Sequence, residues 1–176
     1  MNRLLLMTGS IACAKASGLI SAWVKQGDQV KVVATRSALK FVGKATLEGL
    51  SGQSVACDAF ESNQMMEHIH LSRWADVMVL CPASANVINK LSAGIADDML
   101  TTTWIAGHGL ANKKIVVPVM NTFMWEYPAT QNALANLQSW GVKVIQPVAG
   151  DLACREQGVG RMPEVNDLLT QIEALL

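Results

Sequence analysis

The sequence predicts an α/β fold in which a parallel sheet lies between two layers of helices. Short apolar runs alternate along the chain with longer segments of helical character, which is the pattern of a parallel sheet covered on both faces. The composition agrees, because 51% of the 176 residues are hydrophobic and only 16% are charged. Such a chain can bury a core of its own and is neither disordered nor a highly charged coiled coil. We expect a single domain over residues 1–176.

Strands are predicted where apolar runs end at turn residues. The first covers residues 4–8 and is followed at once by Gly9 and Ser10. The other strands are predicted at residues 30–34, 77–80, 114–117 and 142–145.

Helices are predicted between these strands, and Gly27 and Gly141 end two of them. The predicted helices cover residues 12–26, 38–49, 67–75, 84–92, 98–106, 130–140 and 164–175. The segment 146–163 holds three glycines and two prolines with little periodicity, so we expect an irregular loop there.

The charge balance excludes some partners. Fourteen Lys and Arg residues match fourteen Asp and Glu residues, which gives no electrostatic reason to expect nucleic acid or an anionic membrane. No run approaches the roughly 20 apolar residues of a membrane span. The four cysteines form no CxxC pair and no metal-ligand cluster with histidine, so we expect reduced thiols, no metal and a cytoplasmic location. The low share of charge favours association with copies of the same chain.

Hydroxyl residues follow the first two predicted strands. Gly9 and Ser10 stand after the first strand, where helix N–H groups and the helix dipole suit a phosphate. After the second strand come Thr35, Arg36 and Ser37, where a dinucleotide site would carry an acidic residue. The GxGxxG pattern is absent.

The third strand is followed by Ser84 and Asn86 at a predicted helix start. An ordinary N-cap serine would need no ligand and would contribute about 1 kcal/mol. However, three hydroxyl-bearing helix starts at one sheet edge favour a mononucleotide whose phosphate is held mainly by neutral donors.

Two further strand ends carry candidate residues. Asn121 follows the fourth strand, and its amide can donate to a carboxylate and accept from an N–H group. Cys154 lies beside Arg155 in the predicted loop, where it is either a small buried thiol or a reactive one. His68 and His70 flank Ile69, and on a helix these histidines point in different directions, so one site cannot use both.

Four sequence motifs together resemble one family. They are His-Ile-His-Leu at 68–71, Trp-Ala-Asp at 74–76, Pro-Ala-Ser-Ala-Asn at 82–86 and Pro-Val-Met-Asn-Thr-Phe-Met-Trp at 118–125. The chain resembles the flavin-containing cysteine decarboxylases, which include phosphopantothenoylcysteine decarboxylases and the peptidyl-cysteine decarboxylases of lantibiotic synthesis. The resemblance runs from the first strand to about residue 162.

The resemblance implies a flavodoxin-like (Rossmann-like) fold that binds FMN near a subunit interface. It also implies assembly into homotrimers or homododecamers and a small cysteinyl compound as substrate. The implied FMN contacts are Gly9, Ser10, Ile11, Thr35, Ser37, Ser84, Ala85, Asn86, Val87 and Val119.

The resemblance also implies roles in catalysis. His68 takes the place of the catalytic base, whereas His70 falls where relatives often carry Glu. Asn121 would hold the substrate carboxylate or the adjacent amide. The implied substrate-binding residues are Asn121, Met124, Leu152 and Ala153.

The implied reaction converts 4′-phosphopantothenoyl-L-cysteine to 4′-phosphopantetheine in coenzyme A biosynthesis. Flavin oxidises the thiol to a thioaldehyde, loss of carbon dioxide leaves an enethiol, and re-reduction uses Cys154 as proton donor. Arg155 departs from the family pattern, in which glycine follows this cysteine.

Three alternatives stay open. The chain could be a peptidyl-cysteine or other cysteinyl decarboxylase that releases the enethiol. It could be a flavin prenyltransferase relative, although the motif at 118–125 and Cys154 argue against this. It could also be a flavin-binding subunit that inhibits a phosphatase, although the retained His68, Asn121 and Cys154 argue against this as its sole role.

Overall fold

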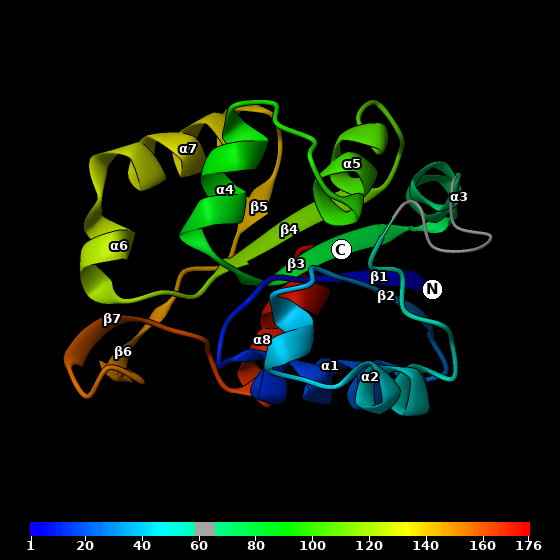
Figure 1. The fold of residues 1–176 in the computed structure, drawn as a ribbon, viewed down its shortest axis with the longest axis horizontal. Coiled ribbons are helices and arrows are strands. Elements are labelled where there is room, and N and C mark those ends of the chain that lie inside the picture. The colour runs from blue at the N-terminus through cyan, green and yellow to red at the C-terminus, as the bar shows by residue number, and fades with distance from the viewer. Residues whose placement is uncertain (59–65) are drawn as a thin grey trace.

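The computed structural model describes residues 1–58 and 66–176 and contains a five-stranded parallel sheet in the order β2-β1-β3-β4-β5 (Figure 1). The strands are β1 Asn2–Met7, β2 Gln29–Ala34, β3 Val77–Ala83, β4 Lys113–Pro118 and β5 Lys143–Val144. The chain runs from β1 outward to β2 and then crosses back to β3. This is the flavodoxin-like strand order, in which ligands bind at the carboxyl ends of the strands where the order reverses. The predicted fold class is confirmed.

Helices cover both faces of the sheet (Figure 1). On one face lie α1 Cys13–Lys25, α2 Lys44–Ser51 and α8 Val165–Ala174, and on the other lie α3 Glu67–Trp74, α4 Ala85–Ser92, α5 Met99–Ala106 and α7 Pro128–Ser139. A 3₁₀ turn, η1 Ala38–Lys40, and a short helix, α6 Thr122–Glu126, complete the described helices.

The alternation of side chains along β1 explains why two cores form. Leu5 and Met7 point into the core shared with α1 and α8, while Leu4 and Leu6 point into the core on the opposite face. All four side chains are fully buried, and each contributes about 2 kcal/mol through the removal of apolar surface from water. The sheet is therefore fixed from both sides, which holds its carboxyl edge rigid.

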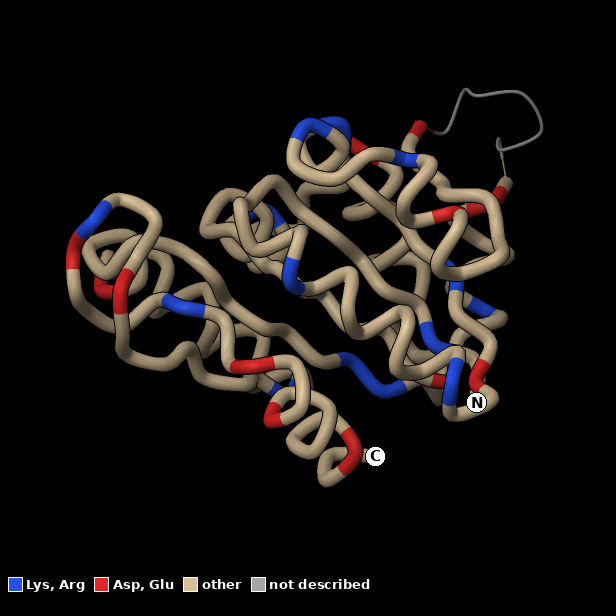
Figure 2. Tube along the Cα trace, turned by 90° about the horizontal axis from the view of Figure 1, so that it is seen from below, with Lys and Arg blue, Asp and Glu red and all other residues tan. Residues whose placement is uncertain are grey.

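Charged residues are spread in small, mixed groups along the chain (Figure 2). Within the described residues, no helix is long and apolar enough to cross a membrane.

A buried ion cluster ties the amino-terminal edge of the sheet together. Arg3 is only 3% exposed, and its guanidinium contacts the carboxylates of Asp28 and Glu173 and lies 5.1 Å from the centre of the Trp23 ring. Burial raises the pKa of Asp28. Hydrogen bonds from the chain's amino group and from Arg3, with their charges, outweigh this effect and hold the pKa below its usual value. The ionised form of Asp28 is therefore stabilised by folding.

Replacing Asp28 with Asn should lower the free energy of unfolding by about 3 kcal/mol at pH 7, because it leaves the Arg3 charge buried with one partner fewer. The folded pKa of Asp28 is lowered, so its contribution is complete above the unfolded pKa of about 3.9 and disappears as pH falls through the folded value. Urea denaturation should show that the difference in free energy of unfolding between variant and parent is smaller at pH 3 than at pH 7. The exposed Asp167→Asn control should lose less than about 0.5 kcal/mol. An equal loss in both variants would contradict this role.

The structure corrects two details of the sequence-based prediction. The helix predicted over 38–49 is instead η1 followed by α2, because the chain is extended at Gly43 (ψ 142°). The loop predicted over 146–163 contains an antiparallel hairpin of β6 Val148–Asp151 and β7 Gln157–Arg161. Burial alternates along both strands, but their sequences, VAGD and QGVGR, show no alternation of large apolar and polar residues that could have predicted strands.

Candidate active site

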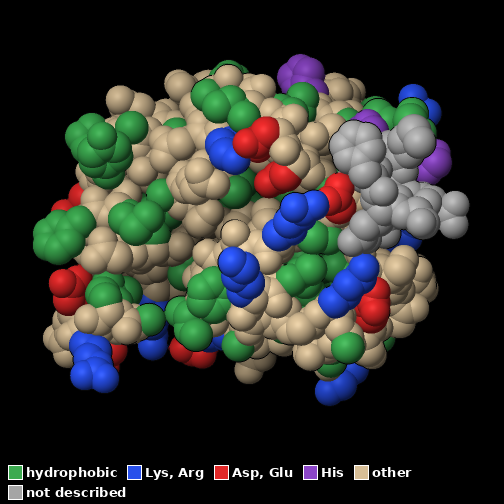
Figure 3. Space-filling view, viewed as in Figure 1, with side chains coloured by type: hydrophobic (Ala, Val, Ile, Leu, Met, Phe, Trp, Pro, Cys, Tyr) green, Lys and Arg blue, Asp and Glu red, His purple; other side chains and the backbone are tan. Residues whose placement is uncertain are grey.

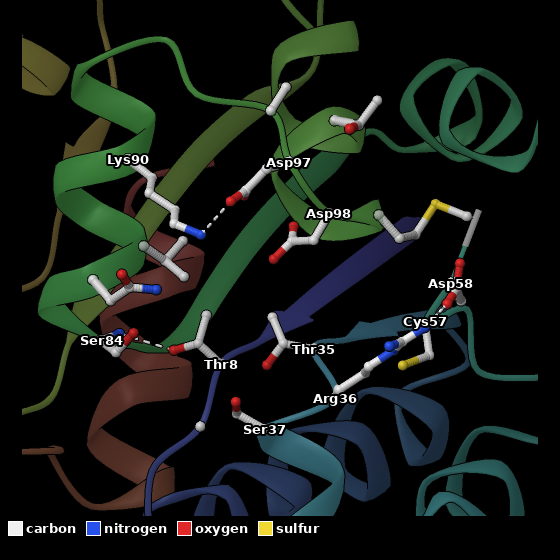
Figure 4. Close-up of a pocket in the computed structure, with 16 residues that line it drawn as sticks. Thr8, Thr35, Arg36, Ser37, Cys57, Asp58, Ser84, Lys90, Asp97 and Asp98 are labelled. Carbon is white, nitrogen blue, oxygen red and sulfur yellow. Dashed lines mark hydrogen bonds and ion pairs between the residues drawn. The ribbon is translucent and has the colours of Figure 1, made fainter. Parts of the chain in front are cut away.

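The carboxyl ends of β1 and β3 are joined by hydrogen bonds through Thr8. Its hydroxyl donates to the carbonyl of Pro82 at 2.7 Å and accepts from the N–H of Ser84 at 2.9 Å (Figure 4). The start of α4 is therefore held beside the loop that follows β1.

Gly9 lets a second loop approach this point. A Cβ atom built on Gly9 would lie 2.7 Å from the Cβ of Ser37, closer than real side chains approach one another. Only glycine therefore allows the loops after β1 and β2 to meet, and this contact brings together two of the predicted phosphate-binding segments.

The helices at this edge begin without side-chain caps. Neither Ala12, before α1, nor Ser84, before α4, makes a side-chain capping hydrogen bond, and the first turn of each helix has no acidic residue. Ser84 is thus the N-cap residue of α4 by position and backbone conformation, but its hydroxyl makes no capping bond and is left for another partner. Two helix N-termini without acidic residues present N–H groups and positive dipole ends at one sheet edge, as an anion site requires.

A cavity of about 830 Å³ opens at this edge, and we call it the strand-end cavity. The predicted FMN contacts that line it are Gly9, Thr35, Ser37, Ser84, Asn86 and Val87. Its volume is that of a site for a cofactor-sized ligand.

Both cations that line the strand-end cavity are paired with carboxylates (Figure 4). Arg36 pairs with Asp58, and the ammonium of Lys90 lies 2.6 Å from Asp97. The hydrogen bond from Lys90 holds the pKa of Asp97 below its usual value. An anion in this cavity would contact hydroxyl and backbone N–H donors, because the charges of the two cations are partly neutralised by their carboxylate partners. This agrees with the predicted phosphate site, which uses mainly neutral donors. Sequence analysis missed the Lys90 pair, although two consecutive acidic residues before a helix could have drawn attention to it.

Two smaller cavities adjoin the same loops. The hairpin cavity, of about 450 Å³, is lined by the predicted residues Ser10, Ile11, Val119, Asn121, Leu152, Ala153 and Cys154. The α6 cavity, of about 260 Å³, is lined by Ala85, Asn86 and Met124 among others. Lys15 and Arg161 also line the hairpin cavity and were not predicted. These three cavities together take in every predicted site residue except His68.

The β6–β7 hairpin is docked onto the loop after β4. The N–H of Met120 donates to the carbonyl of Gly160 at 3.1 Å, and a Cβ on Gly160 would lie 2.0 Å from the carbonyl oxygen of Met120. Glycine is thus required for the hairpin to lie against the strand end. This docking brings Cys154 to Asn121, although they are far apart in sequence.

One carboxylate links the two predicted substrate-site residues. The side-chain oxygen of Asn121 accepts from the N–H of Met124 at 3.1 Å and caps α6, which orients the amide nitrogen. That nitrogen donates to Oε2 of Glu156 at 3.1 Å, and the thiol of Cys154 donates to the same oxygen at 3.3 Å. Glu156 was not predicted, and its position two residues after the cysteine was the available signal.

Arg155 adopts the conformation that glycine would adopt. Its φ is +65°, and it is the single non-glycine residue with positive φ in the described part of the chain. Its N–H donates to the carbonyl of Leu152 at 2.9 Å and closes the turn. The departure from the family's glycine therefore leaves the path of the loop intact and adds an exposed cation beside Cys154.

His68 lies on α3, which packs against α5, and it lines none of the three cavities. Its Nδ1 is buried and has no hydrogen-bond partner among the residues that the structure describes. His70 is exposed, with its Nδ1 3.6 Å from the carboxylate of Glu67. The helix thus separates the two histidines, as predicted, and leaves His68 half-buried.

Apolar side chains are exposed beside the α6 cavity. Phe123 is 72% exposed and Tyr127 is 60% exposed, and Figure 3 shows apolar side chains gathered over this end of the molecule. Exposed aromatic residues beside a candidate site are typical of a surface that another protein chain covers.

Known proteins resemble the chain along its whole length. The model of the family described as Flavoprotein matches residues 1–176. The bifunctional coenzyme A biosynthesis protein CoaBC of Bacillus subtilis is 40% identical over 98% of this chain and 42% of its own length. The probable phosphopantothenoylcysteine decarboxylase of Streptococcus mutans is 37% identical over 98% of this chain and 97% of its own length. The chain spans about two fifths of the bifunctional relatives.

Solved structures share the fold. A cysteine-to-serine variant of a PPC decarboxylase, complexed with pantothenoylaminoethenethiol, has a TM-score of 0.86 and 31% identity over 98% of this chain and 96% of that chain. The peptidyl-cysteine decarboxylase EpiD has a TM-score of 0.82 and 25% identity over 98% of each chain.

Proposed function

Because the chain belongs to the flavoprotein family that includes the phosphopantothenoylcysteine decarboxylases, we propose that it is an FMN-dependent carboxy-lyase of coenzyme A biosynthesis. Its substrate would be 4′-phosphopantothenoyl-L-cysteine and its product 4′-phosphopantetheine. The observation that carries the proposal is the docking of the hairpin, which places Cys154 and Asn121 in the lining of the hairpin cavity and links them through Glu156. We further propose that residues 1–176 form one domain working in the cytoplasm, where its four cysteines would stay reduced.

The strand-end cavity fits the phosphate of FMN. The uncapped start of α4 would offer N–H groups, and Thr35, Ser37 and Ser84 would offer hydroxyls. When bound, FMN supplies the reversible two-electron oxidation that gives a cysteine carboxylate somewhere to place its electrons as carbon dioxide leaves.

The other residues act on the substrate. The amide of Asn121, fixed by its capping bond, would bind the cysteine carboxylate. Cys154, on the hairpin, would return a proton to the decarboxylated carbon skeleton, and His68 would remove one from the substrate. Met124, Leu152 and Ala153 would line the substrate side.

We propose that copies of the chain, as a homotrimer or homododecamer, complete this site. Within one chain His68 lies outside the cavities, and the aromatic residues beside the α6 cavity are exposed. An assembly that covers this surface would exclude water and could bring α3 of one copy to the cavities of the next.

The proposed function is tested by product analysis. The purified protein should show flavin absorbance, and incubation with 4′-phosphopantothenoyl-L-cysteine should yield, by mass spectrometry, a product that has lost carbon dioxide alone. Loss of carbon dioxide together with two hydrogens would instead support a decarboxylase that releases the enethiol. Arg155, in place of the family's glycine, is the departure from the family pattern that keeps this second candidate open. Absence of flavin would contradict both.

Gly9→Val should weaken FMN binding about 10-fold or more, because the added atoms collide with Ser37 and separate two loops of the phosphate site. Flavin retained per protein chain after dialysis measures this. Gly49→Ala is the matched control, since its added Cβ would meet no atom within 4 Å. Equal flavin content in both variants would show that the strand-end cavity does not hold the cofactor.

A further inference from the structure

We propose that Glu156 is an internal ligand that occupies the substrate-carboxylate position at Asn121 until substrate displaces it. The inference rests on the proposed function and adds a positioning residue to the site. It starts from the contact between the Asn121 amide and Oε2 of Glu156, 3.1 Å apart.

The geometry leaves the amide one orientation. Because the oxygen of Asn121 caps α6 through the N–H of Met124, the NH₂ group must point away from the helix. The group it meets there is a carboxylate, the same chemical group that a cysteinyl substrate would present. A second carboxylate on this amide would lie close to the first, and like charges repel strongly at such distances.

Glu156 is held in place by the loop itself. The N–H of Leu152 donates to the backbone carbonyl of Glu156 at 2.8 Å, and the thiol of Cys154 donates to its side chain at 3.3 Å. The carboxylate therefore holds Cys154 and Asn121 together when no substrate separates them. Exchange of this carboxylate for that of the substrate frees the Cys154 thiol from Glu156 as the substrate arrives.

Two thiol-free ligands test the exchange without turnover. 4′-Phosphopantothenoyl-L-serine carries the carboxylate, and 4′-phosphopantothenoyl-ethanolamine lacks it. With the FMN-loaded enzyme and titration calorimetry, Glu156→Ala should raise the affinity for the serine ligand about threefold to tenfold, as expected for the loss of one competing hydrogen bond. The affinity for the ethanolamine ligand should stay unchanged, which a general loosening of the loop would not produce.

Three further variants separate competing explanations. Glu156→Gln keeps an acceptor oxygen, so its affinity for the serine ligand should rise less than that of Glu156→Ala. An equal rise in both variants would indicate charge repulsion alone and would overturn the proposal. Asn121→Ser keeps a capping oxygen but removes the amide donor, so adding Glu156→Ala to it should bring no gain. Glu126→Ala removes an exposed carboxylate from α6 and should change neither affinity.

The remaining outcomes are decisive. The role of Glu156 would be overturned if Glu156→Ala raised the affinity for both ligands or for neither. It would also be overturned if the affinity still rose when Glu156→Ala was combined with Asn121→Ser. The proposed decarboxylase function would stand in each case. If the parent enzyme bound neither ligand, the proposed function and this inference would fail together.

Discussion

Replacing His68 with Asn should lower kcat for decarboxylation by about 100-fold to 10,000-fold, the usual loss when a proton-transferring side chain is removed. Asn is polar but cannot exchange a proton. Within residues 1–58 and 66–176 the buried Nδ1 of His68 has no hydrogen-bond partner, so the substitution breaks no described bond at this atom and the fold should persist. Carbon dioxide release measures the rate, and thermal unfolding checks the fold.

His70→Asn is the matched control, because this exposed residue lies two positions further along α3. It should keep the parental kcat. Parental activity in His68→Asn, or an equal loss in both variants, would remove His68 from the mechanism and leave α3 a structural element.

Replacing Cys154 with Ser should change the product rather than stop the reaction. Decarboxylation should continue, while formation of the saturated thiol should fall about 100-fold or more because a hydroxyl is a far weaker acid than a thiol. The enethiol should then accumulate and be seen by mass spectrometry as a product lacking two hydrogens.

Gln157→Ser controls for a change of side chain on the same hairpin, since Gln157 is exposed and lies outside the three cavities. It should yield the saturated thiol at the parental rate. If Cys154→Ser also gave the saturated thiol at an undiminished rate, the proton would have to come from another group.

The sheet could be predicted because its strands are buried on both faces. Leu4, Leu5 and Leu6 read as a continuous apolar run, and Gly9 marks its end. The strand ends then gave the positions of the candidate site, because the carboxyl ends of parallel strands meet at one edge. The structure gathers Gly9, Ser37 and Ser84 there.

What remained hidden depends on contacts between distant segments. The hairpin could not be predicted, because Gly158 and Gly160 are determined by their approach to Thr122 and Met120 rather than by a local pattern. For the same reason, the bond between Asn121 and Glu156, which are 35 positions apart, could not be predicted, although the position of Glu156 close to Cys154 was a signal. The packing of α3 against α5, which leaves His68 outside the three cavities, likewise had no local signal in the sequence.

The positive φ of Arg155 bears on the lifetime of the turn that carries Cys154. A residue with a Cβ is less stable in the left-handed region than elsewhere by about 1 kcal/mol, which corresponds to about a fivefold change in population. Compared with a turn that has glycine at position 155, this turn should therefore convert more often to other backbone conformations.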